Sequence, residues 1–98
     1  MQKNEWSQEE YLHNKKINET KGIKTLLIDT INKPIEGITT VIYNPYELQT
    51  YPKDTVFVFY CDTGKSTSER LNAYQKKFPD KRCISLKGGR GYWRRTRV

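Results

Sequence analysis

The sequence has few of the residues on which metal and hydrolase chemistry depend. Its 98 residues include one histidine, His13, and two cysteines, Cys61 and Cys83. Three such residues are too few for a four-ligand Cys/His zinc site. A serine hydrolase triad needs a histidine beside its nucleophile, and the only histidine is His13, so we expect no such triad. The composition therefore predicts no metal centre and no triad.

Long hydrophobic runs are also missing. The longest, TLLI and VFVFYC, are far too short to cross a bilayer. The opening MQKNEWSQEE is too acidic and polar for a signal peptide. We therefore expect a cytoplasmic protein without membrane contact. In a reducing cytoplasm Cys61 and Cys83 should be free thiols, although two cysteines are enough for one disulfide.

The chain is polar but its apolar residues are clustered, which indicates a folded core. Hydrophobic residues make up 35% and charged residues 30% of a length that suits one domain. Within a single domain over 1–98 we expect an N-terminal helical region over 1–22, a core over 23–93 and a basic tail over 94–98. The net charge of +7 implies an acidic partner or simply a basic surface.

Helical patterns alternate with short strand patterns along the chain. Ser7 and Glu10 form a capping box before a helix whose apolar positions are Tyr11, Leu12 and Ile17, and Gly22 ends that helix. Runs of strand composition follow at 23–29, 38–45, 55–61 and 81–89. A turn or a single helical turn is predicted over 46–54.

A second helix is predicted over 66–80. Ser66 and Glu69 form another capping box, and Leu71, Tyr74 and Phe78 fall on one helical face. Strands that alternate with helices predict an α/β fold with a central, mainly parallel sheet flanked by helices. Binding sites in such sheets form at the carboxyl ends of strands.

Cys61 lies at that end of the most apolar strand and opens a loop of polar residues. The loop residues are Asp62, Thr63, Gly64, Lys65, Ser66 and Thr67. Backbone amides and the helix dipole at this position stabilise a thiolate or an anionic sulfur derivative, and glycine permits the tight curvature. Lys65 adds a positive charge, and the hydroxyls add hydrogen-bond donors. The alternative is that Cys61 is only a buried core residue, which is the interpretation we prefer for Cys83.

The second half of the chain resembles a single-domain rhodanese. That family has a loop of the pattern Cys-x-x-Gly-x-Ser/Thr/Arg and a last strand that ends in Gly-Gly-x-x-x-Trp. The matching positions are Cys61, Gly64, Ser66, Gly88, Gly89 and Trp93. LLIDT and EGITTVIYNP are similar to earlier family segments, so the resemblance extends over about 24–93.

The resemblance implies a sulfurtransferase or persulfide carrier with Cys61 as nucleophile and Ser66 beside the persulfide. The implied sulfur donor is thiosulfate or a persulfidated protein, and neither a metal nor an organic cofactor is implied. Asp62 stands where many members have a residue that tolerates an anionic donor, which disfavours thiosulfate. Asp29, at the end of LLID, is interpreted as a structural cap. Threonine at position 67 removes the arginine clamp of a related phosphatase.

The C-terminal residues are basic and carry aromatic side chains. Arg90, Arg94 and Arg95 are candidate docking residues for a thiolated tRNA or an acidic sulfur-carrier protein. A solvated tail with Trp93 packed in the core is equally in keeping with the pattern. The alternative function is a non-catalytic rhodanese-like binding or regulatory module that uses this basic surface.

Overall fold

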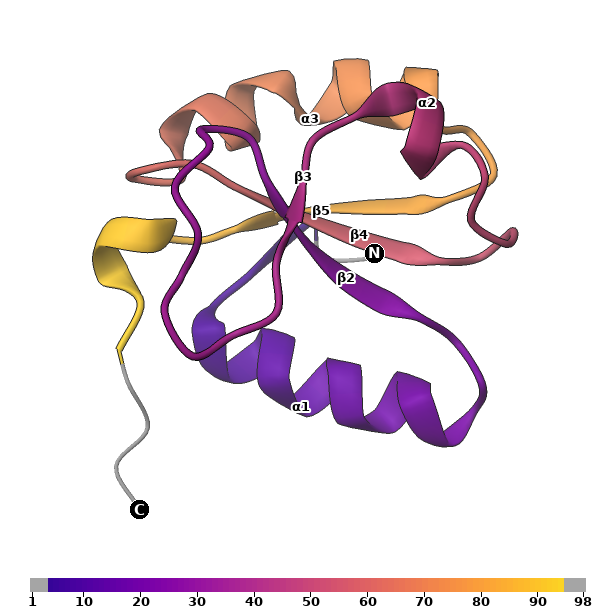
Figure 1. The fold of residues 1–98 in the computed structure, drawn as a ribbon, viewed down its shortest axis with the longest axis horizontal. Coiled ribbons are helices and arrows are strands. Elements are labelled where there is room, and N and C mark those ends of the chain that lie inside the picture. The colour runs from indigo at the N-terminus through magenta and orange to yellow at the C-terminus, as the bar shows by residue number, and fades with distance from the viewer. Residues whose placement is uncertain (1–3, 95–98) are drawn as a thin grey trace.

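A five-stranded parallel sheet with helices on both faces forms the centre of the molecule (Figure 1). The computed structural model describes residues 4–94. Its elements in chain order are β1 (Glu5–Trp6), α1 (Gln8–Thr20), β2 (Thr25–Asp29), β3 (Val41–Ile42), α2 (Pro45–Leu48), β4 (Val56–Tyr60), α3 (Lys65–Lys77), β5 (Arg82–Leu86) and the 3-10 turn η1 (Arg90–Tyr92). The strand order is β1-β5-β4-β2-β3, and all neighbours are parallel. The predicted α/β fold is confirmed.

Strand β4 occupies the middle of the sheet, and all five of its residues are buried. Phe57 and Phe59 pack on the face that α2 and α3 cover, whereas Val58 and Tyr60 pack on the α1 face. Because helices cover both faces, every position of the strand is apolar or aromatic rather than every second one. Side chains alternate along a strand, so the residue after Tyr60 faces α3 again.

The α3 face is held to the sheet by aromatic contacts. Leu71, Tyr74 and Phe78 are buried as the helical spacing predicts. The Tyr74 ring stacks on Phe59 with a centroid distance of 4.1 Å, and Phe78 meets Phe57 edge to face at 5.4 Å. These contacts hold the middle and the C-terminal end of α3 against β4.

The N-terminal segment differs from the expectation of a helix alone. Glu5 and Trp6 form β1, which pairs with the end of β5, and Trp6 is buried. A two-residue edge strand has no hydrophobic period of its own, so only its pairing with β5 defines it. The capping box of Ser7 and Glu10 is confirmed. Of the apolar positions expected for α1 only Tyr11 is buried, while Leu12 and Ile17 are exposed.

Boundaries in the rest of the chain also differ from the prediction, and two of them matter most. The strand expected over 38–45 is reduced to Val41–Ile42, because only these residues pair with β2. The capping box of Ser66 and Glu69 does not form: α3 begins at Lys65, its N-cap is Gly64, and no side chain caps it. Gly64 has a φ of 87°, which turns the chain into the helix two residues earlier than the pattern indicates. The short helix α2 fits the predicted single turn.

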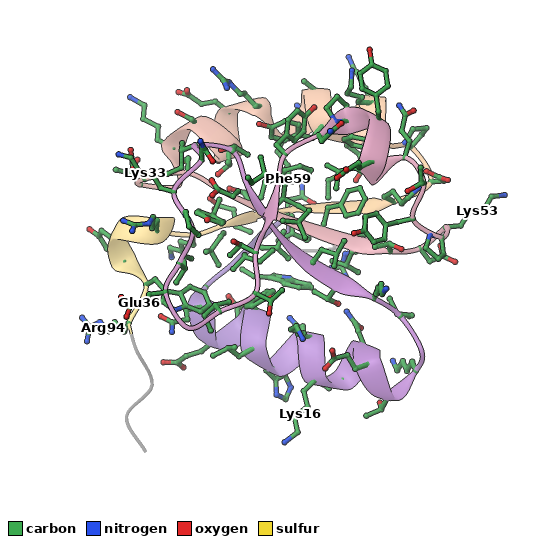
Figure 2. The ribbon with its side chains drawn as sticks, in the orientation of Figure 1. Lys16, Lys33, Glu36, Lys53, Phe59 and Arg94 are labelled. Atoms are coloured by element: carbon green, nitrogen blue, oxygen red, sulfur yellow. The ribbon has the colours of Figure 1, made fainter. Side chains whose placement is uncertain are left out.

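The positive charge is spread over the molecule. Figure 2 shows Lys16, Lys33 and Lys53 projecting outward from different sides, while Phe59 lies at the centre. All three lysines are exposed. Among the described residues, no helix has the length and apolar character needed to span a bilayer.

Candidate active site

Cys61 follows β4 directly and faces α3, at the base of the loop that leads into this helix. Its Sγ accepts a hydrogen bond from the amide of Gly64 at 3.1 Å. The hydroxyl oxygen of Thr67 lies 3.7 Å from the same sulfur. Cys61 is 4% exposed, so the loop encloses the sulfur almost completely.

These contacts make the sulfur more acidic. Burial raises the pKa of the Cys61 thiol, but hydrogen bonds from the amide and hydroxyl of Thr67 and from the amides of Gly64 and Thr63 act in the opposite direction. Their combined effect exceeds that of burial, and the pKa lies below the ordinary value of 9.0. The loop therefore favours the thiolate through dipoles, as its sequence predicted.

The segment after β5, from the diglycine into η1, holds the loop in place. The amide of Arg90 donates to the carbonyl of Cys61 at 2.7 Å, and the amide of Gly91 donates to that of Asp62 at 2.8 Å. A Cβ on Gly89 would lie 2.3 Å from the Cys61 carbonyl oxygen, and one on Gly64 would lie 2.8 Å from the amide nitrogen of Gly88. The two glycine motifs of the sequence are therefore halves of one close backbone contact.

The other predicted loop residues differ in their exposure and in whether they contact the Cys61 sulfur. Thr67 is fully buried and contacts the sulfur, whereas Ser66, which was expected at this position, is exposed. Asp62, Thr63 and Lys65 are exposed as well. The reason is the early start of α3, which turns residue 67 rather than residue 66 toward the sheet. Thr67, not Ser66, is the hydroxyl that faces the sulfur.

Sequence reasoning missed Ser85 on β5. Its Oγ lies 2.8 Å from the Thr67 hydroxyl, and both residues are 0% exposed. One feature of the sequence could have indicated it: Ser85 is a single hydroxyl residue between apolar positions of β5.

Cys83 is remote from this site. It pairs with Phe57 in the sheet, four residues before Cys61, so the two cysteines are offset by about 13 Å along the strands. A disulfide needs Cα atoms within about 7 Å, so this sheet register excludes a bond between them. Both cysteines are free. Burial raises the pKa of Cys83 to about 12, in agreement with its interpretation as inert core.

Asp29 has the geometry of a structural residue. It ends β2 and is buried, and its Oδ1 accepts the amide of Ile31 at 2.8 Å. Its Oδ2 has no hydrogen-bond partner among the described residues. The turn that follows β2 is thereby fixed, which agrees with the predicted capping role.

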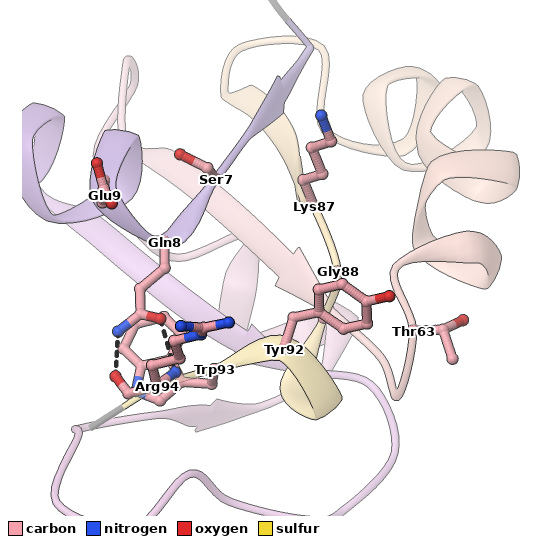
Figure 3. A pocket seen from close by; sticks show the side chains of 10 residues that line it. Ser7, Gln8, Glu9, Thr63, Lys87, Gly88, Tyr92, Trp93 and Arg94 are labelled. Atoms are coloured by element: carbon pink, nitrogen blue, oxygen red, sulfur yellow. Dashed lines mark hydrogen bonds between the residues drawn. The ribbon is translucent and has the colours of Figure 1, made fainter. Parts of the chain in front are cut away.

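A pocket of about 600 Å³ lies beside the loop (Figure 3). Thr63, Gly88 and Gly89 form its side toward the loop, and Lys87 and Arg94 bring positive charge to it. The Gln8 side chain bonds the main chain of Arg94 through both its nitrogen and its oxygen.

The predicted docking arginines are not all at this pocket. Arg94 lines it, but the Nε of Arg90 donates to the carbonyl of Pro34 at 3.2 Å on another side of η1. Arg95 lies outside the described residues. Trp93 is partly buried against the α1 face and meets the Tyr11 ring edge to face at 6.0 Å, so its predicted packing role is supported.

Comparisons with protein-family models, curated proteins and solved structures find no match to this chain. Within residues 4–94 there is no group of three or more histidine, cysteine, aspartate or glutamate side chains that could hold a metal ion. Any assignment of activity therefore depends on the motifs and on the geometry around Cys61.

Proposed function

We propose that this chain is a rhodanese-like sulfurtransferase or persulfide carrier with Cys61 as its nucleophile. One observation supports the proposal above the others: the Cys61 sulfur accepts the Gly64 amide at 3.1 Å inside a loop that lowers its pKa. A purely structural cysteine in an apolar core has a raised pKa, as Cys83 has.

The proposed reaction has two displacement steps. The Cys61 thiolate attacks the outer sulfur of a persulfide donor, a new S–S bond forms, and the donor leaves as a thiolate. The loop amides and the Thr67 hydroxyl then hold the negative outer sulfur of the Cys61 persulfide. An acceptor nucleophile attacks that outer sulfur, and Cys61 leaves again as a thiolate. No electrons are gained or lost overall.

A persulfidated protein suits this site better than thiosulfate as the donor. Asp62 is exposed beside Cys61, and its carboxylate repels a dianion that approaches the sulfur. Lys87 and Arg94, at the neighbouring pocket, supply positive charge for an acidic sulfur-carrier protein or a tRNA. We place this chemistry in the cytoplasm, where a free thiol persists.

A non-catalytic rhodanese-like binding module is the alternative function. It is favoured by the burial of Cys61, which is 4% exposed and does not line the pocket beside the loop. Such a module would keep the fold and use Lys87, Arg90 and Arg94 for docking.

Intact mass spectrometry separates the two functions. The protein is incubated with a cysteine desulfurase and cysteine, or with thiosulfate, and compared with Cys61→Ser and, as a matched control, Cys83→Ser. We expect the wild type and Cys83→Ser to gain one cyanide-labile sulfur atom from the desulfurase, and Cys61→Ser to gain none. No gain on a folded protein with a free thiol would contradict the enzyme and favour the binding module.

A further inference from the structure

Ser85 lies directly behind the residue that contacts the sulfur. It is on the α3 face of β5 and pairs in register with Phe59, two residues before Cys61. Its Oγ is 2.8 Å from Thr67 Oγ1, and neither residue is exposed to solvent. Among the described residues, Thr67 is the hydrogen-bond partner of the Ser85 hydroxyl.

Thr67 has one hydroxyl proton and three polar neighbours. They are Cys61 Sγ at 3.7 Å, the Gly64 carbonyl at 3.4 Å and Ser85 Oγ at 2.8 Å. A hydroxyl donates one hydrogen bond, so the proton of Thr67 serves only one of the three at a time. The short contact with Ser85 therefore determines where the Thr67 proton points. If Thr67 donates to Ser85, the sulfur loses this donor.

We propose that Ser85 is a positioning residue for Cys61: it donates to Thr67 Oγ1 and thereby leaves the Thr67 proton free to point at an anionic sulfur. An anionic sulfur accepts only, and hydrogen bonds to charged acceptors are the stronger ones. Both hydroxyls are sealed from water, so no solvent molecule replaces Ser85 as donor. The order Ser85 to Thr67 to sulfur is then the arrangement of hydrogen bonds that satisfies the thiolate.

The charged groups around the loop do not take over the role of the hydrogen bonds from Ser85 to Thr67 and from Thr67 to the sulfur. Asp62 and Lys65 on the loop, and Lys87 and Arg90 after β5, are all exposed. The acidity of the sulfur depends on burial and on hydrogen bonds from residues 63, 64 and 67. A change in the buried hydroxyls should therefore affect the thiolate directly.

The effect on the thiolate depends on geometry alone, while its consequence for sulfur transfer rests on the proposed function. The terminal sulfur of a Cys61 persulfide would be an anion beside the same hydroxyl. Ser85 should therefore also influence how long the persulfide survives, if one forms.

The test is the pH dependence of Cys61 alkylation by iodoacetamide, with the labelled peptide identified by mass spectrometry. We expect Ser85→Ala to raise the thiol pKa by about half a unit, a loss of about threefold in thiolate at neutral pH. Ser85→Thr, which keeps the hydroxyl, should restore the wild-type profile. Thr67→Val should raise the pKa at least as much, and adding Ser85→Ala to it should change nothing more.

Thr55→Val is the matched control, because it removes a buried hydroxyl at the other end of β4, where Thr55 Oγ1 donates to the Pro52 carbonyl. It should leave the thiol pKa unchanged even where it lowers stability. Ser85→Val, which suits a strand and also lacks the hydroxyl, serves where the alanine variant fails to fold. A wild-type thiol pKa in folded Ser85→Ala or folded Ser85→Val protein would overturn the proposal. Because alkylation needs no persulfide, a raised pKa without sulfur loading would instead contradict only the proposed function.

Discussion

Replacing Gly89 by alanine tests whether the diglycine holds the loop that follows Cys61. The added Cβ would lie 2.3 Å from the carbonyl oxygen of Cys61, 2.7 Å from the amide nitrogen of Gly64 and 2.9 Å from the carbonyl carbon of Asp62. All three are backbone atoms, so no side chain can rotate to make room. The backbone of Gly89 also has φ 57° and ψ −154°, a region that other residues avoid.

Both effects destabilise the fold. Backbone strain of this kind costs about 1–3 kcal/mol, and forcing an extra carbon into a packed site costs about 1–3 kcal/mol more. We therefore expect Gly89→Ala to lower the free energy of unfolding by about 2–6 kcal/mol, measured by urea denaturation followed through tryptophan fluorescence. Because the loop must move to relieve the overlap, the Gly64 amide should leave the sulfur and the Cys61 thiol pKa should rise.

Gly37→Ala is the matched control. Gly37 also has a positive φ, 82°, but a Cβ there meets nothing within 4 Å. It should cost only the strain of a left-handed residue, about 1–2 kcal/mol, and leave the pH profile of Cys61 alkylation unchanged. Equal stability losses in the two variants, or a folded Gly89→Ala protein with the wild-type thiol pKa, would refute the contact between the diglycine and the loop.

Three further predictions concern single side chains. Ser66 and Lys65 are exposed, so Ser66→Ala and Lys65→Ala should each leave the Cys61 alkylation profile unchanged, and a raised pKa would contradict the assignment of Thr67 as the contact. The pKa of Cys83 is raised by burial to about 12, so its contribution to stability is present below 9.0 and is lost as the pH rises toward 12. Cys83→Ala should therefore weaken the alkaline loss of stability in urea unfolding, and an unchanged loss would assign it to other groups. Asp29→Asn keeps the acceptor for Ile31 and removes a buried carboxylate with an unpartnered oxygen, so its stability should match or exceed that of wild type, whereas Asp29→Ala should lose about 1 kcal/mol. Sulfur loading should survive in both Asp29 variants, and its loss in a folded Asp29→Asn protein would give Asp29 a chemical role.

The sequence predicts the parts of this fold whose burial is continuous. Strand β4 is apolar or aromatic at every position, and α3 has Leu71, Tyr74 and Phe78 at helical spacing on one face. Apolar residues with such spacing must pack against a core, so both elements can be predicted from the sequence. Pairing decides the remaining strands. β1 and β3 have two residues each, and partners distant in sequence define them.

The candidate site divides in the same way. The roles of Cys61 and Gly64 can be predicted from the local sequence, because a cysteine, a tight turn and a helix start follow one another along the chain. The hydroxyl that contacts the sulfur cannot be predicted in this way, because it depends on whether the N-cap of α3 is residue 64 or residue 66, and the capping box indicated residue 66. The contact of Ser85 with Thr67 is harder still to predict. Its role arises from the register between β4 and β5, which no local pattern of β5 shows.

The way in which the sulfur is stabilised also bears on its proposed substrate. Amides and a buried hydroxyl lower the Cys61 pKa, and the cations nearby remain exposed at the rim. Dipoles aimed at one atom favour a single negative charge on that atom, whereas a dianion such as thiosulfate needs counter-charges that reach it. Asp62 is also exposed at this rim, and its negative charge repels such a dianion. A donor that delivers its sulfur as a persulfide on a protein brings less charge into the loop, so we expect loading from a desulfurase to exceed loading from thiosulfate.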